Sequence, residues 1–283
     1  MRIIDLYRKS FTISFEIFPP KTEAGDINLW KEMQALSDLG PGYISVTYGA
    51  GGSTREKTLD IALKIRDSYN IIPLVHFTCV GSGEKEIARY LEIVKKKEII
   101  NILALRGDPP VGEEHFTPPP DGFSHANELV KFIKGLDDFA IAVAGYPEGH
   151  IEAENIDTDI DNLKRKVDAG ADFIITQLFY DNNDYYTFID KITQKGITVP
   201  VIPGIMPVTS LAQITKITGM CGARIPKKLL AELQQCRSDE TICKTGIEYS
   251  TRQCHELKQW GVQGFHFYTL NKSAAVNKII ESL

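Results

Sequence analysis

Short apolar runs rich in β-branched and aromatic residues alternate along the chain with stretches of helical periodicity. Strand alternating with helix is typical of a parallel sheet covered by helices. We expect strands in eight runs, namely Thr12–Phe18, Tyr43–Thr47, Leu74–Thr78, Ile99–Leu105, Ala140–Ala144, Phe173–Gln177, Val201–Gly204 and Gly264–Tyr268. The expected helices include Ile27–Leu39, Arg55–Tyr69, Glu84–Lys97, Asn162–Ala169 and Tyr185–Lys195.

Eight such units can form a closed (β/α)8 barrel or an open doubly wound sheet. No GxGxxG motif opens a helix after the first strand, and GAGGS at 49–53 lacks that spacing, so we interpret it as an ordinary loop. Polar residues follow the strands where they end, as do Glu16, Thr47, His76, Tyr146 and Gln177. In a barrel these residues converge on one face, where such enzymes place their chemistry. The pattern therefore favours a (β/α)8 TIM-type barrel.

Two irregular regions interrupt the alternation. Residues Asp108–Phe123 are rich in Pro and Gly and predict a surface loop near the site, whereas Ile225–Trp260 predicts two or three helices. A chain of 283 residues that is 43% hydrophobic can bury a large core. We therefore expect residues 1–283 to form a single domain.

Composition narrows the classes of partner. The formal net charge of -5 offers no general attraction to nucleic acid or anionic membranes. No apolar run reaches the roughly 20 residues that a membrane helix needs, and the N-terminus does not resemble a signal peptide, so we expect a cytoplasmic protein. Its 5 cysteines form no CxxC pair, and His76 and His150, the histidines best placed by the strands, belong to no HExxH motif. We expect no metal site.

Glu16 is the strongest candidate for acid-base chemistry. It lies in SFEIFPP, an apolar strand that ends at Pro19, so its carboxyl group is expected at a barrel mouth where water is scarce. Desolvation there would raise its pKa and let it act as an acid. The alternative is a structural ion pair with a neighbouring cation.

Charged residues at two other places have two readings each. Arg106 and Asp108 follow a buried strand in ALRGDPP, where they could recognise a polar heterocycle or form a local ion pair. Lys164, Arg165 and Lys166 fall within one helical turn, where they could meet a diphosphate or form a solvated helix face.

Several motifs occur in the order typical of one family. These are SFEIFPPK, SVTYGAGGS, HFTC, ALRGDPP, GYPEGH, LKRKVDAGADFIITQLFYD and PGIMP, and the match runs from SFEIFPP to FHFYTLN. On these motifs the chain resembles the flavin-dependent methylenetetrahydrofolate reductase family of bacterial type, limited to the catalytic barrel. The resemblance implies FAD at the C-terminal ends of the strands and a ping-pong hydride transfer that reduces 5,10-methylenetetrahydrofolate to 5-methyltetrahydrofolate.

The resemblance also assigns roles to residues. Glu16 would protonate N10 of the folate, and Asp108 would lie near the flavin and contact the pterin. Gln177, Gln213 and Lys272 would bind folate, with Thr47, Gln177 and Ile217 at the nicotinamide. The residues matched to FAD binding are Thr47, Tyr48, Ala50, His76, Arg106, Gly107, Asp108, His125, Ala126, Tyr146, His150, Asp159, Asn162, Arg165 and Lys166.

Three positions depart from well-known members. Ile217 stands where Phe or Leu occurs, His125 where Tyr occurs, and Lys272 where Arg is common. The resemblance leaves open whether electrons come from NADH, another donor or a partner subunit. It does not fix the oligomeric state, and no regulatory domain is expected.

Two other functions remain open from the residues. An aldolase-type barrel acting on a phosphorylated substrate would use the same fold, but it requires a lysine at a strand end, and the expected strands supply none. A catalytically silent folate-binding or flavin-binding subunit is the non-enzymatic alternative. The presence of Glu16, Asp108 and Gln177 argues against it.

Overall fold

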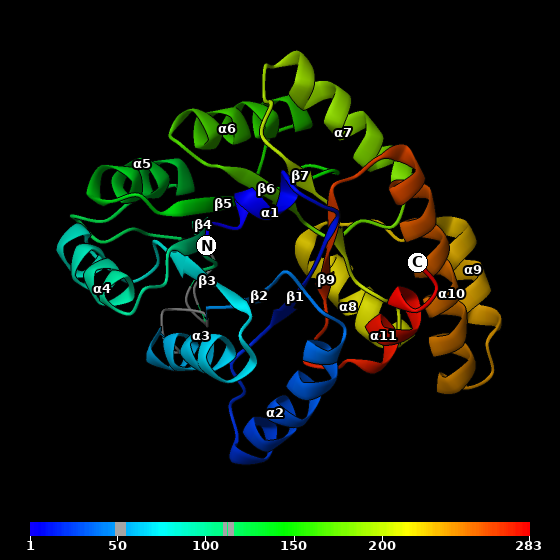
Figure 1. The fold of residues 1–283 in the computed structure, drawn as a ribbon. Coiled ribbons are helices and arrows are strands. Elements are labelled where there is room, and N and C mark those ends of the chain that lie inside the picture. The colour runs from blue at the N-terminus through cyan, green and yellow to red at the C-terminus, as the bar shows by residue number, and fades with distance from the viewer. Residues whose placement is uncertain (49–54, 110–111, 113–115) are drawn as a thin grey trace.

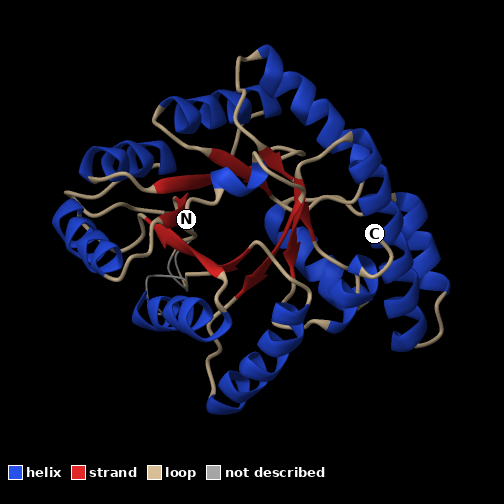
Figure 2. Cartoon of the chain, viewed as in Figure 1, coloured by secondary structure: helices blue, strands red, loops and turns tan. Residues whose placement is uncertain are grey.

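The computed structural model describes residues 1–48, 55–109, 112 and 116–283, in which parallel strands form a barrel inside a ring of helices (Figure 1). Figure 2 shows the strands as the inner ring and the helices outside it. The strands are β1 (Thr12–Ile17), β2 (Tyr43–Val46), β3 (Ile72–Thr78), β4 (Asn101–Leu105), β5 (Ala140–Gly145), β6 (Phe173–Thr176), β7 (Val201–Ile202), β8 (Gly204–Ile205) and β9 (Gly264–Tyr268). The helices are α1 (Ile4–Tyr7), α2 (Glu23–Asp38), α3 (Arg55–Tyr69), α4 (Glu84–Lys96), α5 (Ala126–Leu136), α6 (Ile156–Asp168), α7 (Asn182–Gln194), α8 (Leu211–Cys221), α9 (Lys227–Gln235), α10 (Asp239–Trp260) and α11 (Ala274–Ile280).

Two short strands on either side of Pro203 together complete the barrel. The strand order is β7-β6-β5-β4-β3-β2-β1-β9-β8, and every pair is parallel. Proline has no N–H group to donate, so the expected strand Val201–Gly204 is split into β7 and β8. The Pro203 carbonyl still accepts from the backbone N–H of His266 at 3.0 Å. The prediction of a (β/α)8 barrel is confirmed.

Side chains alternate between the two surfaces of the barrel wall. On β1, Phe15 and Ile17 pack outward against the helices as part of the main hydrophobic core. Ser14 and Glu16 alternate with them and point inward, since successive strand residues face opposite ways. A second cluster inside the barrel contains Tyr43 and Phe173. Polar residues in the upper interior therefore come from alternate positions of different strands.

Three helices begin earlier than expected, and each has a capping side chain. The side chains of Thr22, Asn155 and Asp181 accept hydrogen bonds from the first turns of α2, α6 and α7. The expected starts at Ile27, Asn162 and Tyr185 were therefore too late. The span from 225 to 260 forms α9 and α10, as predicted. Within 108–123, the described residues form neither helix nor strand.

Helix α1 lies across the N-terminal end of the barrel, which we call the base (Figure 1). Ile3, Ile4 and Tyr7 pack into the interior cluster, and the Tyr7 hydroxyl meets that of Tyr43 at 2.8 Å. The strand and helix patterns did not predict this segment. A helix of 4 residues is too short to show a periodicity.

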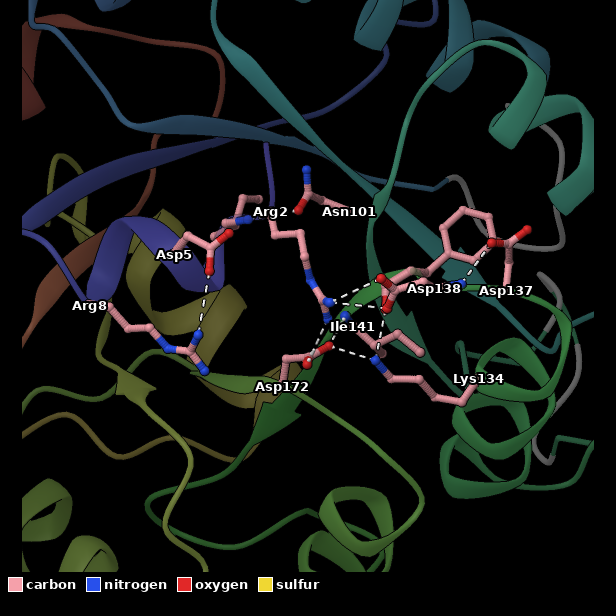
Figure 3. Close-up of polar contacts among 11 residues, drawn as sticks. Arg2, Asp5, Arg8, Asn101, Lys134, Asp137, Asp138, Ile141 and Asp172 are labelled. Carbon is pink, nitrogen blue, oxygen red and sulfur yellow. Dashed lines mark hydrogen bonds and ion pairs between the residues drawn. The ribbon is translucent and has the colours of Figure 1, made fainter.

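Ion pairs hold α1 at the base (Figure 3). Arg2 pairs with Asp138 at 3.0 Å and with Asp172 at 3.2 Å, and Lys134 pairs with Asp172 at 2.9 Å. Asp172 also accepts from the backbone N–H of Ile141 at 2.7 Å. The carboxylate of Asp172 therefore connects the N-terminus, α5 and β5.

Among the described residues, no helix combines the length and apolar character needed to cross a membrane.

Candidate active site

Two adjoining cavities open at the C-terminal ends of the strands. The mouth cavity, about 470 Å³, is lined by residues that include Glu16, His76 and Gln177. The side cavity, about 330 Å³, lies between β4, β5, α5 and α6. Arg106, Tyr146 and His150 line both cavities. The two spaces therefore adjoin, one at the barrel axis and the other beside the first turn of α5 and the inner face of α6.

Glu16 lies deep in the mouth cavity between two histidines. Its side chain is 20% exposed, and its Oε2 atom lies 3.4 Å from Nε2 of His76 and 3.7 Å from Nε2 of His266. His76 comes from β3 and His266 from β9. In the strand order β9 is next to β1 on one side, and β3 lies beyond β2 on the other side. The closed barrel thus brings together three titratable groups that are far apart in the sequence.

These neighbours reverse the expected shift of the Glu16 pKa. Burial raises the pKa of the carboxyl group, but the neighbouring histidines, chiefly through the contact with His266, outweigh burial and lower it. The expectation that desolvation would raise the pKa of Glu16 is therefore wrong in direction. A lowered pKa favours the carboxylate, so an acid role for Glu16 requires a source of protons close by.

His76 remains neutral near pH 7. Burial lowers the pKa of its imidazole to about 4, although the charge of Glu16 opposes that shift. Its Nε2 atom has no hydrogen-bond partner within the described part of the chain. A buried polar atom of this kind at a cavity is available to a ligand.

The side cavity is bordered by cations and small side chains. Arg106 forms a two-pronged ion pair with Glu152, in which Nη2 lies 2.8 Å from Oε1. The local pairing of Arg106 is thus with Glu152, across the cavity. Ala126 and Ala144 also line this space, and their methyl groups leave room for a bulky ligand.

Helix α6 separates the basic patch into two faces. Arg165 and Lys166 line the side cavity, whereas Lys164 pairs with Asp168 on the same helix. The Nζ atom of Lys166 donates to the carbonyl of Ala144 at 2.6 Å. Burial lowers the pKa of Lys166 to about 8, and the charge of Asp159 opposes that shift. The hypothesis of a solvated helix face therefore suits Lys164, and the hypothesis of a phosphate site suits Arg165 and Lys166.

Gly107 brings the backbone close to the mouth cavity. Its φ is +92°, and a Cβ atom there would lie 2.5 Å from Cγ2 of Val80. No other residue type fits this conformation without displacing Val80. The two adjoining cavities have cations beside one and a mixture of apolar and charged residues beside the other, a lining that an organic dinucleotide with a diphosphate could occupy.

The structure places most of the expected site residues on the two cavities. Those on the mouth cavity are Glu16, Thr47, Tyr48, His76, Arg106, Gly107, Asp108, Tyr146, His150, Gln177 and Ile217. Those on the side cavity also include His125, Ala126, Asp159, Asn162, Arg165 and Lys166.

Two expected residues lie away from both cavities, and a third is not described. Gln213 is in the first turn of α8, where its side chain meets Thr209 at 3.1 Å, and Lys272 is exposed beyond β9. Ala50 lies outside the described residues. Their roles stay predictions.

The sequence placed the HFYTLN segment at the mouth but assigned no role to two of its residues. His266 is fully buried and contacts Glu16, and Tyr268 lines the cavity and donates to the carbonyl of Thr176 at 2.6 Å. Both residues belong to FHFYT, where every second position faces the interior. That alternation was the signal that could have identified them.

Potential metal ligands do not gather in the described ranges. No three His, Cys, Asp or Glu side chains there are arranged to hold an ion.

Comparison with known proteins identifies the family. A family model described as methylenetetrahydrofolate reductase matches residues 2–283. The chain belongs to this family. It is 38% identical to 5,10-methylenetetrahydrofolate reductase of Escherichia coli, over 96% of this chain and 90% of that one. It is 40% identical to methylenetetrahydrofolate reductase (NADH) 1 of Arabidopsis thaliana, but covers only 48% of that protein.

Solved structures support the fold of this methylenetetrahydrofolate reductase family member. An uncharacterized protein from Clostridium thermocellum that binds two copies of 5-methyl-5,6,7,8-tetrahydrofolic acid matches 99% of the chain, with a TM-score of 0.65 and 16% identity. A 2,3-dimethylmalate lyase matches with a TM-score of 0.54 and 12% identity. At these identities the likeness concerns the fold alone.

Proposed function

We propose that the protein reduces 5,10-methylenetetrahydrofolate to 5-methyltetrahydrofolate by hydride transfer through bound FAD. The observation that carries the proposal is the position of Glu16 at the bottom of a cavity that continues into a space lined by cations. The names of the relatives in Escherichia coli and Arabidopsis thaliana, 5,10-methylenetetrahydrofolate reductase and methylenetetrahydrofolate reductase (NADH) 1, support methylenetetrahydrofolate as the substrate. The chain spans about half the length of the plant relative.

The residues that line the two cavities would bind different parts of the cofactor. Arg165 and Lys166 would meet the diphosphate of FAD, and Arg106 would exchange its contact with Glu152 for one with the cofactor. Tyr146 and His150, whose rings lie 4.7 Å apart edge to face, would support the cofactor between the two spaces. FAD, when bound, supplies the hydride.

Residues of the chain would activate the folate for reduction. Glu16 would donate a proton to N10, which breaks the bond between N10 and the bridging carbon and leaves a cation at N5. Asp108 at the rim would favour that cation through its negative charge, and Gln177 would hydrogen-bond the pterin. Ping-pong order follows if folate and electron donor use the mouth cavity in turn.

NADH is the proposed donor, since Ile217 on α8 and Gln177 line a mouth cavity of about 470 Å³ and the plant relative is named as an NADH enzyme. The alternative is a partner subunit that delivers electrons to the same flavin. We also propose that the chain acts in the cytoplasm.

Product analysis under anaerobic conditions tests the reaction. We expect 5-methyltetrahydrofolate to form from 5,10-methylenetetrahydrofolate when NADH is added to the purified protein. Product that appears only with a chemical reductant of the flavin would support the partner subunit. An absence of product with both reductants would contradict the proposed function.

A further inference from the structure

Arg224 joins three segments at the C-terminal end of the barrel strands. Its Nε atom donates to Oε2 of Glu148 at 2.8 Å, and its Nη2 atom donates to Oδ1 of Asp184 at 2.7 Å. The backbone N–H of Arg224 also donates to Oε2 of Glu148, at 2.9 Å. One arginine thus bridges two carboxylates, and we call these three residues the Arg224 cluster.

Glu148 belongs to the connection between β5 and α6, which supplies residues to both cavities. In this connection the backbone N–H of Gly149 donates to the carbonyl of Tyr146 at 3.0 Å and closes a turn around Glu148. Tyr146 and His150, on either side of Glu148, line both the mouth cavity and the side cavity. The Arg224 cluster is therefore attached to the segment proposed to support the flavin.

The other two members adjoin further residues of the mouth cavity. Asp184 lies in the first turn of α7, in the segment that follows Gln177. Arg224 follows the C-terminal end of α8, and Ile217 on that helix lines the mouth cavity, as does Gln177. The cluster therefore connects α8 to two segments that continue directly from the strands of the barrel.

Helix α8 has a small buried face, so its position depends strongly on contacts at its ends. Among its 11 described residues, Ile214 and Thr218 are the buried ones. Ile214 and Ile217 pack in an apolar cluster that is separate from the main hydrophobic core. Because packing of an apolar face normally fixes a helix in place, a helix with little such packing needs other anchors.

The burial of Glu148 makes the Arg224 cluster stronger than an ordinary surface ion pair. The Glu148 side chain is 7% exposed, although that of Arg224 is 72% exposed. Exposed ion pairs contribute little, but a buried carboxylate that loses its partner is costly. Burial raises the pKa of Glu148, and its contacts with Arg224 oppose that shift. Loss of the guanidinium group should therefore displace the chain after α8.

We infer that Arg224 is a positioning residue that holds α8 beside the mouth cavity, so that Ile217 borders the folate and the nicotinamide. The inference rests on the proposed function. Among the residues that the structure describes, no member of the Arg224 cluster lines either cavity. The effect of Arg224 on ligand affinity is therefore transmitted through α8.

Arg224→Gln tests this role, since glutamine cannot bridge the two carboxylates. Calorimetric titration of the flavin-loaded protein measures the dissociation constant of 5-methyltetrahydrofolate, and steady-state kinetics give kcat and the KM values. We expect the dissociation constant and the KM for both substrates to rise about fivefold to tenfold, a usual size for coupling between sites. The value of kcat and the dissociation constant of FAD should stay within about twofold, because α8 contributes to binding of the two substrates alone.

A double-mutant cycle with Ile217→Ala tests the path through α8. If Arg224 acts by placing Ile217, most of its effect is already lost in Ile217→Ala. We then expect Arg224→Gln to weaken binding of 5-methyltetrahydrofolate by no more than about twofold in the Ile217→Ala background. Effects that simply add would mean that Arg224 acts through another element, and they would overturn the inference.

A matched control and a milder variant complete the test. Arg237→Gln alters an exposed arginine between α9 and α10 and should leave all of these constants unchanged. Arg224→Lys keeps the charge but lacks the fork that reaches two carboxylates at once. It should shift the constants in the same direction as Arg224→Gln by a smaller amount, and it serves as the test if Arg224→Gln does not fold.

The outcomes separate this inference from the proposed function. A wild type that does not reduce 5,10-methylenetetrahydrofolate contradicts the proposed function itself. A wild type that reacts, together with unchanged dissociation constants and KM values in both Arg224 variants, overturns only the role of Arg224. Parallel losses of flavin binding and kcat would mean a general loss of structure and would overturn it equally.

Discussion

The base and the mouth of the barrel both carry charged side chains, but they arrange them differently. At the base, Asp172 pairs with Arg2 and Lys134 and accepts from the backbone N–H of Ile141. At the mouth, Glu16 and His76 lie on a cavity, and Nε2 of His76 has no hydrogen-bond partner among the residues that the structure describes. The Asp172 carboxylate is thus satisfied within the protein, whereas the Nε2 atom of His76 faces a cavity.

We infer from this difference that the base contributes mainly to stability and the mouth to chemistry, as is general for barrels of this kind. A paired carboxylate whose hydrogen bonds are made within the protein contributes to folding. A carboxylate on a cavity, beside groups with shifted pKa values, suits acid-base work. Substitutions at the two ends should therefore separate activity from stability, and each prediction below tests that separation.

The largest effect is expected from Glu16→Gln at the mouth. Glutamine cannot donate a proton to N10, so folate reduction should fall by at least about 100-fold. Flavin content and flavin reduction by NADH should stay near wild-type values. Rapid-mixing measurement of the two half-reactions decides between the outcomes. Equal losses in both would mean that Glu16 has another role.

Lys166→Met should weaken flavin binding by about 10-fold to 100-fold, the usual worth of a hydrogen bond to a charged group. Lys164→Met is the matched control, because Lys164 pairs with Asp168 instead of lining the cavity. Fluorescence titration of the apoprotein with FAD measures both dissociation constants. Equal effects of the two substitutions would contradict the division of α6 into a binding face and a solvated face.

At the base, Asp172→Asn should lower the free energy of unfolding by about 2 kcal/mol, since it weakens two ion pairs and a backbone contact. Asp138→Asn is the control, because its side chain is 79% exposed whereas that of Asp172 is 20% exposed. We expect a change within about 0.5 kcal/mol for that control. Urea unfolding measures both. A loss of folate reduction in folded Asp172→Asn protein would break the separation of the two ends.

The smallest effect concerns pH and flavin affinity. Burial lowers the pKa of Lys166 to about 8, so its charge is present below that pH and is lost above it. The dissociation constant for FAD should therefore rise by about threefold to tenfold between pH 7 and pH 9. Lys166→Met should remove most of that dependence. The same slope in wild type and variant would assign the dependence to another group.

Local patterns predicted most of the fold. Alternating apolar positions and turn residues identified the strands, because strands buried on both faces are strongly apolar. The split around Pro203 could be explained only with the partner strand in place, since β7 pairs with β6 while β8 pairs with β9. Helix α1 was missed because its packing depends on contacts with distant strands.

The candidate site was predicted in its residues but not in its electrostatics. The apolar neighbours of Glu16 in β1 indicate burial, yet His76 and His266 are distant in the sequence and reverse the direction of its pKa shift. Strand ends were recognisable from the sequence, whereas the meeting of side chains from β1, β3 and β9 depends on closure of the barrel. Local sequence patterns likewise did not predict the ion pair between Arg106 and Glu152.

The visible spectrum of the protein purified under anaerobic conditions tests the central claim most directly. The account predicts flavin absorption that bleaches with NADH and returns when 5,10-methylenetetrahydrofolate is added. If NADH leaves the flavin oxidised but the flavin cycles after chemical reduction, NADH is not the donor and the proposed folate reduction stands. Protein that binds no flavin, or reduced flavin that the folate leaves bleached, would contradict the account.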